Sequence, residues 1–224
     1  MEKTISKRQM SVNIQQNEQQ RTLELCCGYS SFSKVAQQEY GYDTITLDVD
    51  PFFHPDICCG VLDWDYKTYP PGYFDIIWSS PPCTEFSNSK RFGVRNLELA
   101  DSIVLRCLAI IEYFKPRLWI IENPYTGLLR HRPYMQGYSY HRIDYCAYDP
   151  DLGMKKSTVL FSNMQHFQPR TCAGPGTCPG MVGRRHRCTA TGSFFPWKSK
   201  KERARELGRV PVELIRSILN FGLV

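Results

Sequence analysis

A cysteine and a glutamate each follow a short apolar run with the composition of a buried strand. Residues 74–78 (FDIIW) lead to SSPPC at 79–83, and residues 118–121 (LWII) lead directly to Glu122. The prolines stop the first strand, because proline lacks the N–H that a ladder needs. If the two strands are parallel, Cys83 and Glu122 lie at the ligand-binding edge of an α/β sheet. One interpretation is a nucleophilic thiol beside an acid–base carboxyl, and the alternative is a core cysteine with a structural ion pair.

A second group of residues has the spacing of a nucleotide-binding site. Residues 21–25 (RTLEL) predict a strand, 26–31 (CCGYSS) a tight turn, and 32–40 a helix whose first N–H groups would face a ligand. Residues 43–50 (DTITLDVD) predict a strand that ends in carboxylates about twenty residues after the glycine turn. Asp48 is then placed to accept a hydrogen bond from a ribose hydroxyl. The alternative is a pair of solvated acids at a strand end.

The remaining patterns complete an α/β fold. Apolar residues recur with helical period from 97 to 114, and Lys115-Pro116 ends that helix. Residues 141–148 and 158–162 alternate like an antiparallel strand pair, and 203–219 predict two helices around GRVP. We therefore predict a doubly wound, Rossmann-like sheet with a small, irregular, basic insertion near the C-terminus. The polar stretch 88–95, which contains Gly93, predicts a mobile loop over the site.

Length and composition limit the class of protein. A chain of 224 residues is expected to form one domain with a real core. No apolar run is long enough to span a membrane, and the glutamine-rich N-terminus has no secretory h-region. The ten cysteines include two adjacent pairs, which favours reduced thiols and an intracellular, non-secreted protein. The expected segments are a flexible polar leader (1–20), a catalytic domain (21–163), a basic recognition-like segment (164–202) and a C-terminal return (203–224).

Positive charge is concentrated near the C-terminus. Residues 164–209 carry ten Lys and Arg against two Glu, or +8, so the rest of the chain sums to about −2 out of the total of +6. Aromatic residues Phe194, Phe195 and Trp197 lie among these charges. Such a segment favours a nucleic-acid partner over a merely solvated surface. The basic residues are Arg170, Arg184, Arg185, Arg187, Lys198, Lys200, Lys201, Arg203, Arg205 and Arg209.

Several of these motifs resemble those of one enzyme family. PPCxxFS at 81–87 is similar to the nucleophile motif of the cytosine-5 DNA methyltransferases, and Glu122-Asn123-Pro124 to their Glu-Asn-Val. Residues 24–33 (ELCCGYSSFS) resemble the family's first motif, with serines in place of its second and third glycines. The order of these motifs from Leu23 to Asn123 is that of the family. The resemblance implies a compact, viral or phage-like enzyme that methylates carbon 5 of a flipped-out cytosine in double-stranded DNA, with S-adenosylmethionine as donor.

The resemblance also implies roles for individual residues. Cys83 would attack C6, Glu122 would hold or protonate N3, and Asn123 would orient the pocket, while Lys156 and Thr158 stand near the positions of two family arginines. Phe32 would pack beside the adenine of the donor. The residues implied to bind the donor are Glu24, Cys26, Gly28, Ser30, Ser31, Phe32, Asp48, Val49, Asp63, Trp64 and Pro81.

Other functions stay open on the sequence. The acceptor could be RNA, because one branch of the family methylates tRNA, or the chain could be a non-catalytic scaffold with the same fold. A metal-binding DNA module is a third alternative. We assign no metal, but Cys172, Cys178, His186 and Cys188 suggest a Cys3His zinc site, for which the alternative is a glycine-rich basic DNA loop.

Overall fold

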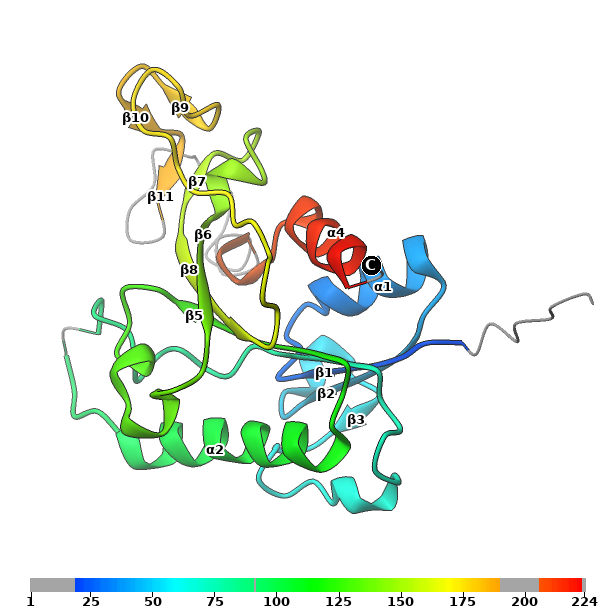
Figure 1. Cartoon of the computed structure of the whole chain (residues 1–224). Helices are drawn as coiled ribbons and strands as arrows, with labels where there is room; N and C mark the ends of the chain where they lie inside the picture. Colours follow the sequence, from blue (N-terminus) through cyan, green and yellow to red (C-terminus); the bar gives the residue numbers. More distant parts are fainter. Residues whose placement is uncertain (1–18, 91, 190–205, 223–224) are drawn as a thin grey trace, which may run out of the picture.

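The computed structural model describes residues 19–90, 92–189 and 206–222. Within them, seven strands form one sheet in the order β3-β2-β1-β4-β5-β8-β6 (Figure 1). The first five strands in this order are parallel, β8 runs antiparallel to β5, and β6 runs antiparallel to β8. The strands are β1 (Arg21–Leu25), β2 (Asp43–Asp48), β3 (Ile57–Cys58), β4 (Ile76–Ser79), β5 (Leu118–Pro124), β6 (Tyr140–Asp144) and β8 (Ser157–Ser162).

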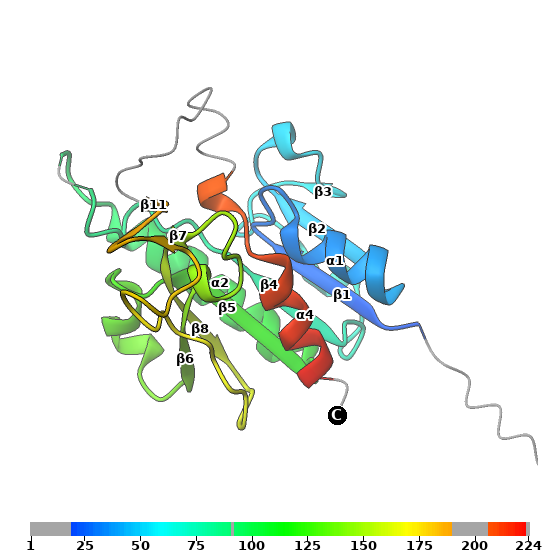
Figure 2. The same cartoon turned by 90° about the horizontal axis from the view of Figure 1, so that it is seen from above.

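Helices cover both faces of the sheet, as a doubly wound fold requires. Helices α1 (Ser31–Tyr40) and α4 (Val212–Phe221) pack side by side on one face, and α2 (Leu97–Phe114) lies on the other (Figure 2). Side chains of β4 alternate between the two layers: Ile76 and Trp78 join the core under α1 and α4, and Ile77 joins the core under α2. The predicted α/β class is confirmed.

Local sequence signals set the ends of the long helix. The side chain of Asn96 accepts a hydrogen bond from the N–H of Leu99 at the start of α2. Lys115, with φ of 49°, closes the helix in the left-handed conformation, and Pro116 cannot continue it. The predicted bounds of this helix, 97 to 114, match the observed ones.

One strand is longer than its sequence suggests. The apolar run predicts that the strand ends before Glu122, but β5 continues to Pro124. The reason is that β8 supplies an antiparallel partner beyond the point where β4 ends, and it pairs Glu122 with Leu160. Glu122 is therefore held within a ladder and not in a loop.

The insertion near the C-terminus is small and irregular, as expected. Strand β7 (Met154–Lys155) pairs with β11 (Cys188–Thr189), and β9 (Met181–Val182) forms a short hairpin with β10 (Arg185–His186), which projects from the sheet in Figure 1. Most of the leader and the residues 190–205 lie outside the described residues. The described 3₁₀ turns are η1 (Pro51–Phe53), η2 (Tyr66–Thr68), η3 (Leu129–His131), η4 (Pro133–Met135) and η5 (Tyr145–Ala147).

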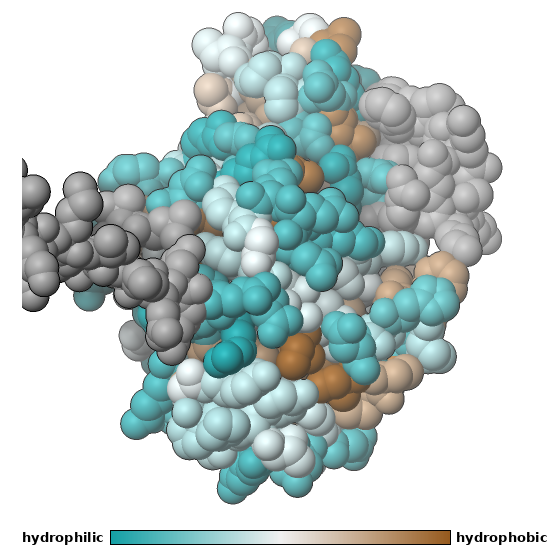
Figure 3. All heavy atoms as spheres, turned by 90° about the vertical axis from the view of Figure 1, so that its right-hand side faces the viewer, coloured by the Kyte–Doolittle hydropathy of each residue, from teal (hydrophilic) through white to brown (hydrophobic). Residues whose placement is uncertain are grey.

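The surface agrees with this layered core. On the face that Figure 3 shows, hydrophilic residues predominate and hydrophobic residues form small separate patches. Across the described ranges, none of the helices has both the length and the apolar character needed to cross a bilayer.

Candidate active site

The sheet brings the predicted nucleophile and the predicted acid to one edge. Strands β4 and β5 are parallel neighbours with Ser79 opposite Ile121, so Cys83 and Glu122 both follow this aligned pair at its carboxyl end. Burial raises the pKa of the Cys83 thiol, the charge of Glu122 raises it further, and the charge of Lys156 lowers it. Cys83, Glu122 and Lys156 are therefore close enough to act on one another electrostatically.

The carboxyl group of Glu122 has two partners on the same oxygen. The hydroxyl of Tyr145 in η5 donates to Oε1 at 3.1 Å, and Nζ of Lys156 lies 3.5 Å from that oxygen. Lys156 is itself positioned by the carbonyl of Leu207 at 3.1 Å and by the ring of Tyr145, whose centroid is 4.6 Å from Nζ. Burial, with a smaller effect of Glu122, raises the pKa of Tyr145 well above its ordinary value, so this phenol stays a donor. Glu122 is only 7% exposed, and its orientation is fixed.

Asn123 connects the two strand ends. Its Nδ2 donates to the carbonyl of Pro81 at 3.0 Å, which joins β5 to the proline loop that carries Cys83. The same loop is held from the other side, because the N–H of Ser80 donates to the carbonyl of Leu25 at 3.1 Å. The loop is thus fixed between the ends of β1 and β5. Thr158, fully buried on β8, lies opposite Pro124.

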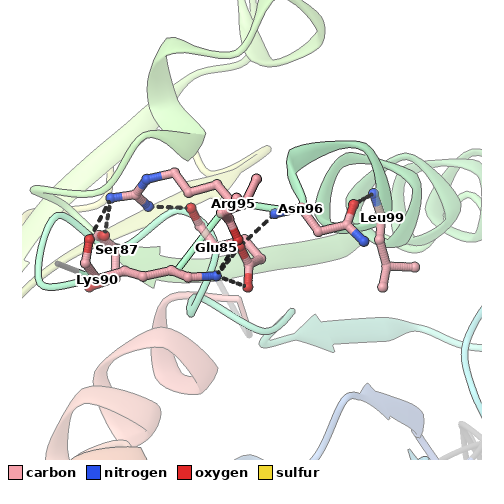
Figure 4. Close-up of polar contacts among 7 residues, drawn as sticks. Glu85, Ser87, Lys90, Arg95, Asn96 and Leu99 are labelled. Atoms are coloured by element: carbon pink, nitrogen blue, oxygen red, sulfur yellow. Dashed lines mark hydrogen bonds and ion pairs between the residues drawn. The ribbon is translucent and has the colours of Figure 1, made fainter. Parts of the chain in front are cut away.

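An ion-pair network follows the cysteine along the chain (Figure 4). The carboxylate of Glu85 accepts from Nζ of Lys90 at 2.6 Å and from the N–H of Asn96 at 2.8 Å. The guanidinium of Arg95 donates to the carbonyls of Glu85 and Ser87 at 2.5 and 2.8 Å. These contacts lower the pKa of Glu85, chiefly through Lys90. They join the segment after Cys83 to the start of α2; the predicted mobility of 88–95 stays a prediction.

The turn after β1 has the open shape expected of a cofactor loop. Cys26, Gly28 and Ser30 have φ of 53°, 50° and 53°. A Cβ added at Gly28 would find no atom within 4 Å, so the space beside that residue is open. The N–H of Gly28 donates to Oδ2 of Asp48 at 2.9 Å, which links the loop to the end of β2. Ser30 adopts a conformation in which glycine is unstrained, at the position where the resemblance places a family glycine.

Glu24 has a different position from the one expected. Its carboxylate, 2% exposed, accepts from the N–H groups of Phe32 and Ser33 at 3.4 and 2.8 Å. These N–H groups belong to the second and third residues of α1, in the first turn that was expected to face a ligand. A buried carboxyl needs such partners, and the helix start offers them. Glu24 therefore holds the loop against the helix and does not itself face the open space beside Gly28.

Two aromatic residues expected at the donor also lie elsewhere. Phe32 has no solvent exposure and stacks on Trp78 with ring centroids 5.3 Å apart, so its ring faces the core and not an adenine. Trp64 is 6% exposed and packs among Tyr66 and Tyr69 under α2. A large ring on an element that covers the sheet is buried by default, and the motif match did not reveal its direction. Of the other residues expected to bind the donor, Cys26, Gly28, Ser30 and Ser31 are partly exposed and Val49 and Asp63 are exposed, whereas Asp48 and Pro81 are largely buried at the same edge of the sheet.

The candidate zinc ligands are only partly the expected ones. Cys172, Cys178 and His186 converge, but their fourth neighbour is Cys146, not Cys188. Cys188 is fully buried beside β7, and its thiol donates to the carbonyl of Leu152 at 3.8 Å. The pairing of β11 with β7 takes Cys188 out of reach, and sequence spacing does not encode that pairing.

The described basic residues serve two different purposes. Arg209 pairs with Asp149 at 2.6 Å and with Glu206 at 3.0 Å, and Arg170 lies over the ring of Tyr148, so both support the fold. Arg184, in the turn between β9 and β10, is exposed. Arg185 and Arg187 are described as well: Arg185 is exposed on β10, and the guanidinium of Arg187 donates to the carbonyl of Asp151 at 2.9 Å. The remaining members of the expected set lie outside the described residues: Phe194, Phe195, Trp197, Lys198, Lys200, Lys201, Arg203 and Arg205.

Sequence reasoning missed Tyr145 and Cys146. Both lie within the stretch 141–148 that was interpreted as a plain strand, and no local motif marks them. Only the break of that strand into η5 turns Tyr145 toward Glu122 and Cys146 toward the insertion.

A sheet with five parallel strands, an open turn after β1, and a cysteine and a glutamate at the carboxyl ends of β4 and β5 defines a Rossmann-like enzyme class. No family model matches the chain. This chain is 34% identical over 221 residues to the "Probable DNA (cytosine-5)-methyltransferase" of Frog virus 3 (isolate Goorha). The match covers 90% of this chain and 99% of the viral protein. The chain therefore belongs to the DNA (cytosine-5)-methyltransferase family.

A solved structure is also similar. It is a provisionally assigned DNA modification methyltransferase encoded within a prophage (E. coli), with 15% identity and a TM-score of 0.48. The similar region covers 68% of this chain, and the chain spans about half (51%) of the length of that protein.

Proposed function

We propose that this protein methylates carbon 5 of cytosine in double-stranded DNA through a transient covalent bond between Cys83 and C6 of the base. The observation that carries the proposal is the placement of Cys83, Glu122 and Asn123 at the joined ends of β4 and β5. The name of the 34% identical viral relative supports it. Because the base is unreachable inside a duplex, it must be flipped out, which costs a few kcal/mol.

The residues at the site suit the chemistry. Carbon 5 of cytosine is a poor nucleophile, and addition of a thiolate at C6 makes C5 electron-rich. Cys83 supplies the sulfur, and Lys156 favours its ionised form against the effect of burial. Glu122, oriented by Tyr145, hydrogen-bonds or protonates N3 and draws electron density from C6. Once C5 carries its methyl group, loss of the C5 proton expels Cys83 by β-elimination.

The loop after β1 fits an S-adenosylmethionine donor, which when bound supplies an electrophilic methyl group. The open space at Gly28 leaves room for close backbone approach. Asp48, whose two oxygens each accept one backbone N–H, from Gly28 and Asp50, keeps lone pairs for a ribose hydroxyl. Val49, beside it, is 70% exposed, an apolar surface that suits an adenine ring. We place the donor on Cys26, Gly28, Ser30, Ser31, Asp48, Val49, Asp63 and the Pro81 loop.

The test combines a substrate analogue with two variants. A duplex that contains 5-fluorocytosine should trap a covalent complex with the native protein in the presence of S-adenosylmethionine, because fluorine cannot leave as a proton does. Cys83→Ala should form no complex and transfer no methyl group while it still binds the donor, and Glu122→Gln should slow transfer by about 10²–10⁴-fold. Methyl transfer by Cys83→Ala, or transfer to matched RNA in place of DNA, would contradict the proposal.

A further inference from the structure

We infer that Cys146, Cys172, Cys178 and His186 form a structural zinc site that fastens the C-terminal insertion to the catalytic sheet. This inference does not depend on the proposed function. One ligand atom from each residue lies within 4.8 Å of all the others. Sγ of Cys172 and of Cys178 lie 3.3 and 3.6 Å from Nε2 of His186.

These separations suit a tetrahedral ion. With zinc–sulfur and zinc–nitrogen bonds of about 2.3 and 2.0 Å, tetrahedral ligands stand about 3.5 Å apart for S···N and about 3.8 Å for S···S. Three cysteines and one histidine are a common structural zinc set, and four protein ligands leave no open position for catalysis. A disulfide would employ two of the sulfurs and leave the third thiol and the imidazole unexplained. A four-ligand cluster therefore indicates a metal more strongly than any pair does.

The backbone around the cluster is built for close approach. A Cβ at Gly180 would lie 3.0 Å from Cβ of Cys146, and one at Gly153 would lie 2.4 Å from the carbonyl of Gly180. Only glycine at these positions lets the insertion press against η5. The N–H of Cys172 donates to Oδ2 of Asp144 at 2.9 Å, which orients that ligand from the end of β6.

The insertion has too little apolar core to be stable by itself, so a metal would stabilise it. Its strands β9 and β10 have two residues each, and Val182 is 67% exposed, so the hairpin buries little apolar surface. Small units without a core are commonly stabilised by a metal. Three thiolates and one zinc ion carry a net charge of −1 once each thiol has released its proton to solvent.

The site also reaches toward the active site. Cys146 follows Tyr145, the residue that donates to Glu122. Ligation of Cys146 would therefore hold η5, and with it the hydroxyl of Tyr145, in place. The sequence alone could not select Cys146, because it lies 26 residues before Cys172, in the turn η5 that follows β6 and not in the glycine-rich loop.

Metal analysis of the purified full-length chain tests the inference. We expect zinc equimolar with the native protein, and near-complete loss of it in Cys146→Ala and His186→Ala. His186→Cys should keep the metal, because it replaces one good ligand by another. Cys188→Ala is the matched control: this thiol is equally buried but outside the cluster, and the variant should keep its zinc.

Two further measurements guard against variants that merely misfold. Cobalt(II) reconstituted into the native protein should give the visible spectrum of a tetrahedral site with sulfur-to-cobalt charge transfer, weakened in Cys146→Ser. Chelation should lower the unfolding temperature of the native protein and of Cys188→Ala alike. Native protein free of zinc, a disulfide among these cysteines, or zinc that survives Cys146→Ala but not Cys188→Ala would overturn the inference.

Discussion

At the residue scale, the active site depends on how one carboxyl group is held. Tyr145 and Lys156 both contact Oε1 of Glu122: the hydroxyl of Tyr145 is a neutral donor, and the ammonium group of Lys156 is a cation. The resemblance places a family arginine near Lys156, but an ammonium group is a point charge without the planar fork of a guanidinium. The structure shows that Lys156 acts on Glu122 and on Cys83 together.

Removal of the Tyr145 hydroxyl should impair catalysis through Glu122. Tyr145→Phe deletes one hydrogen bond to a carboxylate, an interaction of about 1.5–3 kcal/mol, so we expect the methyl-transfer kcat to fall by about tenfold or more with KM for DNA little changed. Tyr148→Phe is the control, because the hydroxyl of Tyr148 accepts a hydrogen bond from the N–H of Arg170 and makes no contact with Glu122. Equal losses of kcat in both variants would show that Tyr145 is only structural.

Replacement of Lys156 should shift the reactivity of Cys83 to higher pH. Burial raises the pKa of this thiol and Lys156 lowers it, so the thiolate fraction grows as pH rises and Lys156→Met should reduce it. At pH 8 we expect alkylation of Cys83 by iodoacetamide to slow by about three- to tenfold, measured by peptide mass spectrometry. Lys155 is an exposed neighbour, and Lys155→Met should leave the pH dependence of Cys83 alkylation unchanged. An unchanged pH dependence in Lys156→Met would refute the effect of Lys156 on Cys83.

At the element scale, the start of α1 shows how a buried acid shapes the cofactor loop. Glu24 occupies the first donors of the helix, and Ser30 completes the turn in a left-handed conformation. The motif match predicted a turn between β1 and α1, which the structure has, but not the inward direction of Glu24 and Phe32. Those directions depend on α1 packing against β1 and β4, and no local pattern specifies that packing.

The buried Glu24 should make stability depend on pH. Burial raises its pKa from the ordinary 4.5 to about 7, so over this range the folded state retains a proton that the unfolded state has released. The stabilisation is therefore present below about pH 4.5 and is lost as pH rises to about 7, by at most about 3 kcal/mol. Glu24→Gln should gain stability relative to the native chain across this window in urea unfolding. Glu39→Gln, at an exposed pair with Arg216, should show no such gain.

At the scale of the whole molecule, some basic side chains of the C-terminal segment make contacts within the fold, and others are exposed to a partner. Arg209 and Arg170 are engaged within the described structure, whereas Arg184 projects from the hairpin of the insertion. The +8 of residues 164–209 is therefore not all available to a polyanion.

If Arg184 meets a phosphate, its loss should change the salt dependence of DNA binding. We expect Arg184→Ala to weaken binding on all sequences alike and to reduce the slope of log K against log salt by about 0.9. Fluorescence anisotropy with a labelled duplex over a salt series measures both. Arg216→Ala, on α4 and paired with Glu39, is the control and should leave the slope unchanged. If Arg184→Ala has the same slope of log K against log salt as the native protein, Arg184 of the hairpin does not contact DNA.

The sequence by itself determined the class of fold, the order of the strands that end in Cys83 and Glu122, and the bounds of α2. These features follow from local causes: apolar periodicity, proline and glycine at strand and helix ends, and a short list of motifs. Only the tertiary structure decided that Tyr145 donates to Glu122, that Glu24 faces a helix start, and that Cys146 replaces Cys188 in the metal cluster. The contacts of Tyr145 and Cys146 join residues far apart in the chain, and they depend on the register of β5, β8 and β6, which the packing of the whole sheet sets. The direction of Glu24 depends instead on how α1 packs against β1.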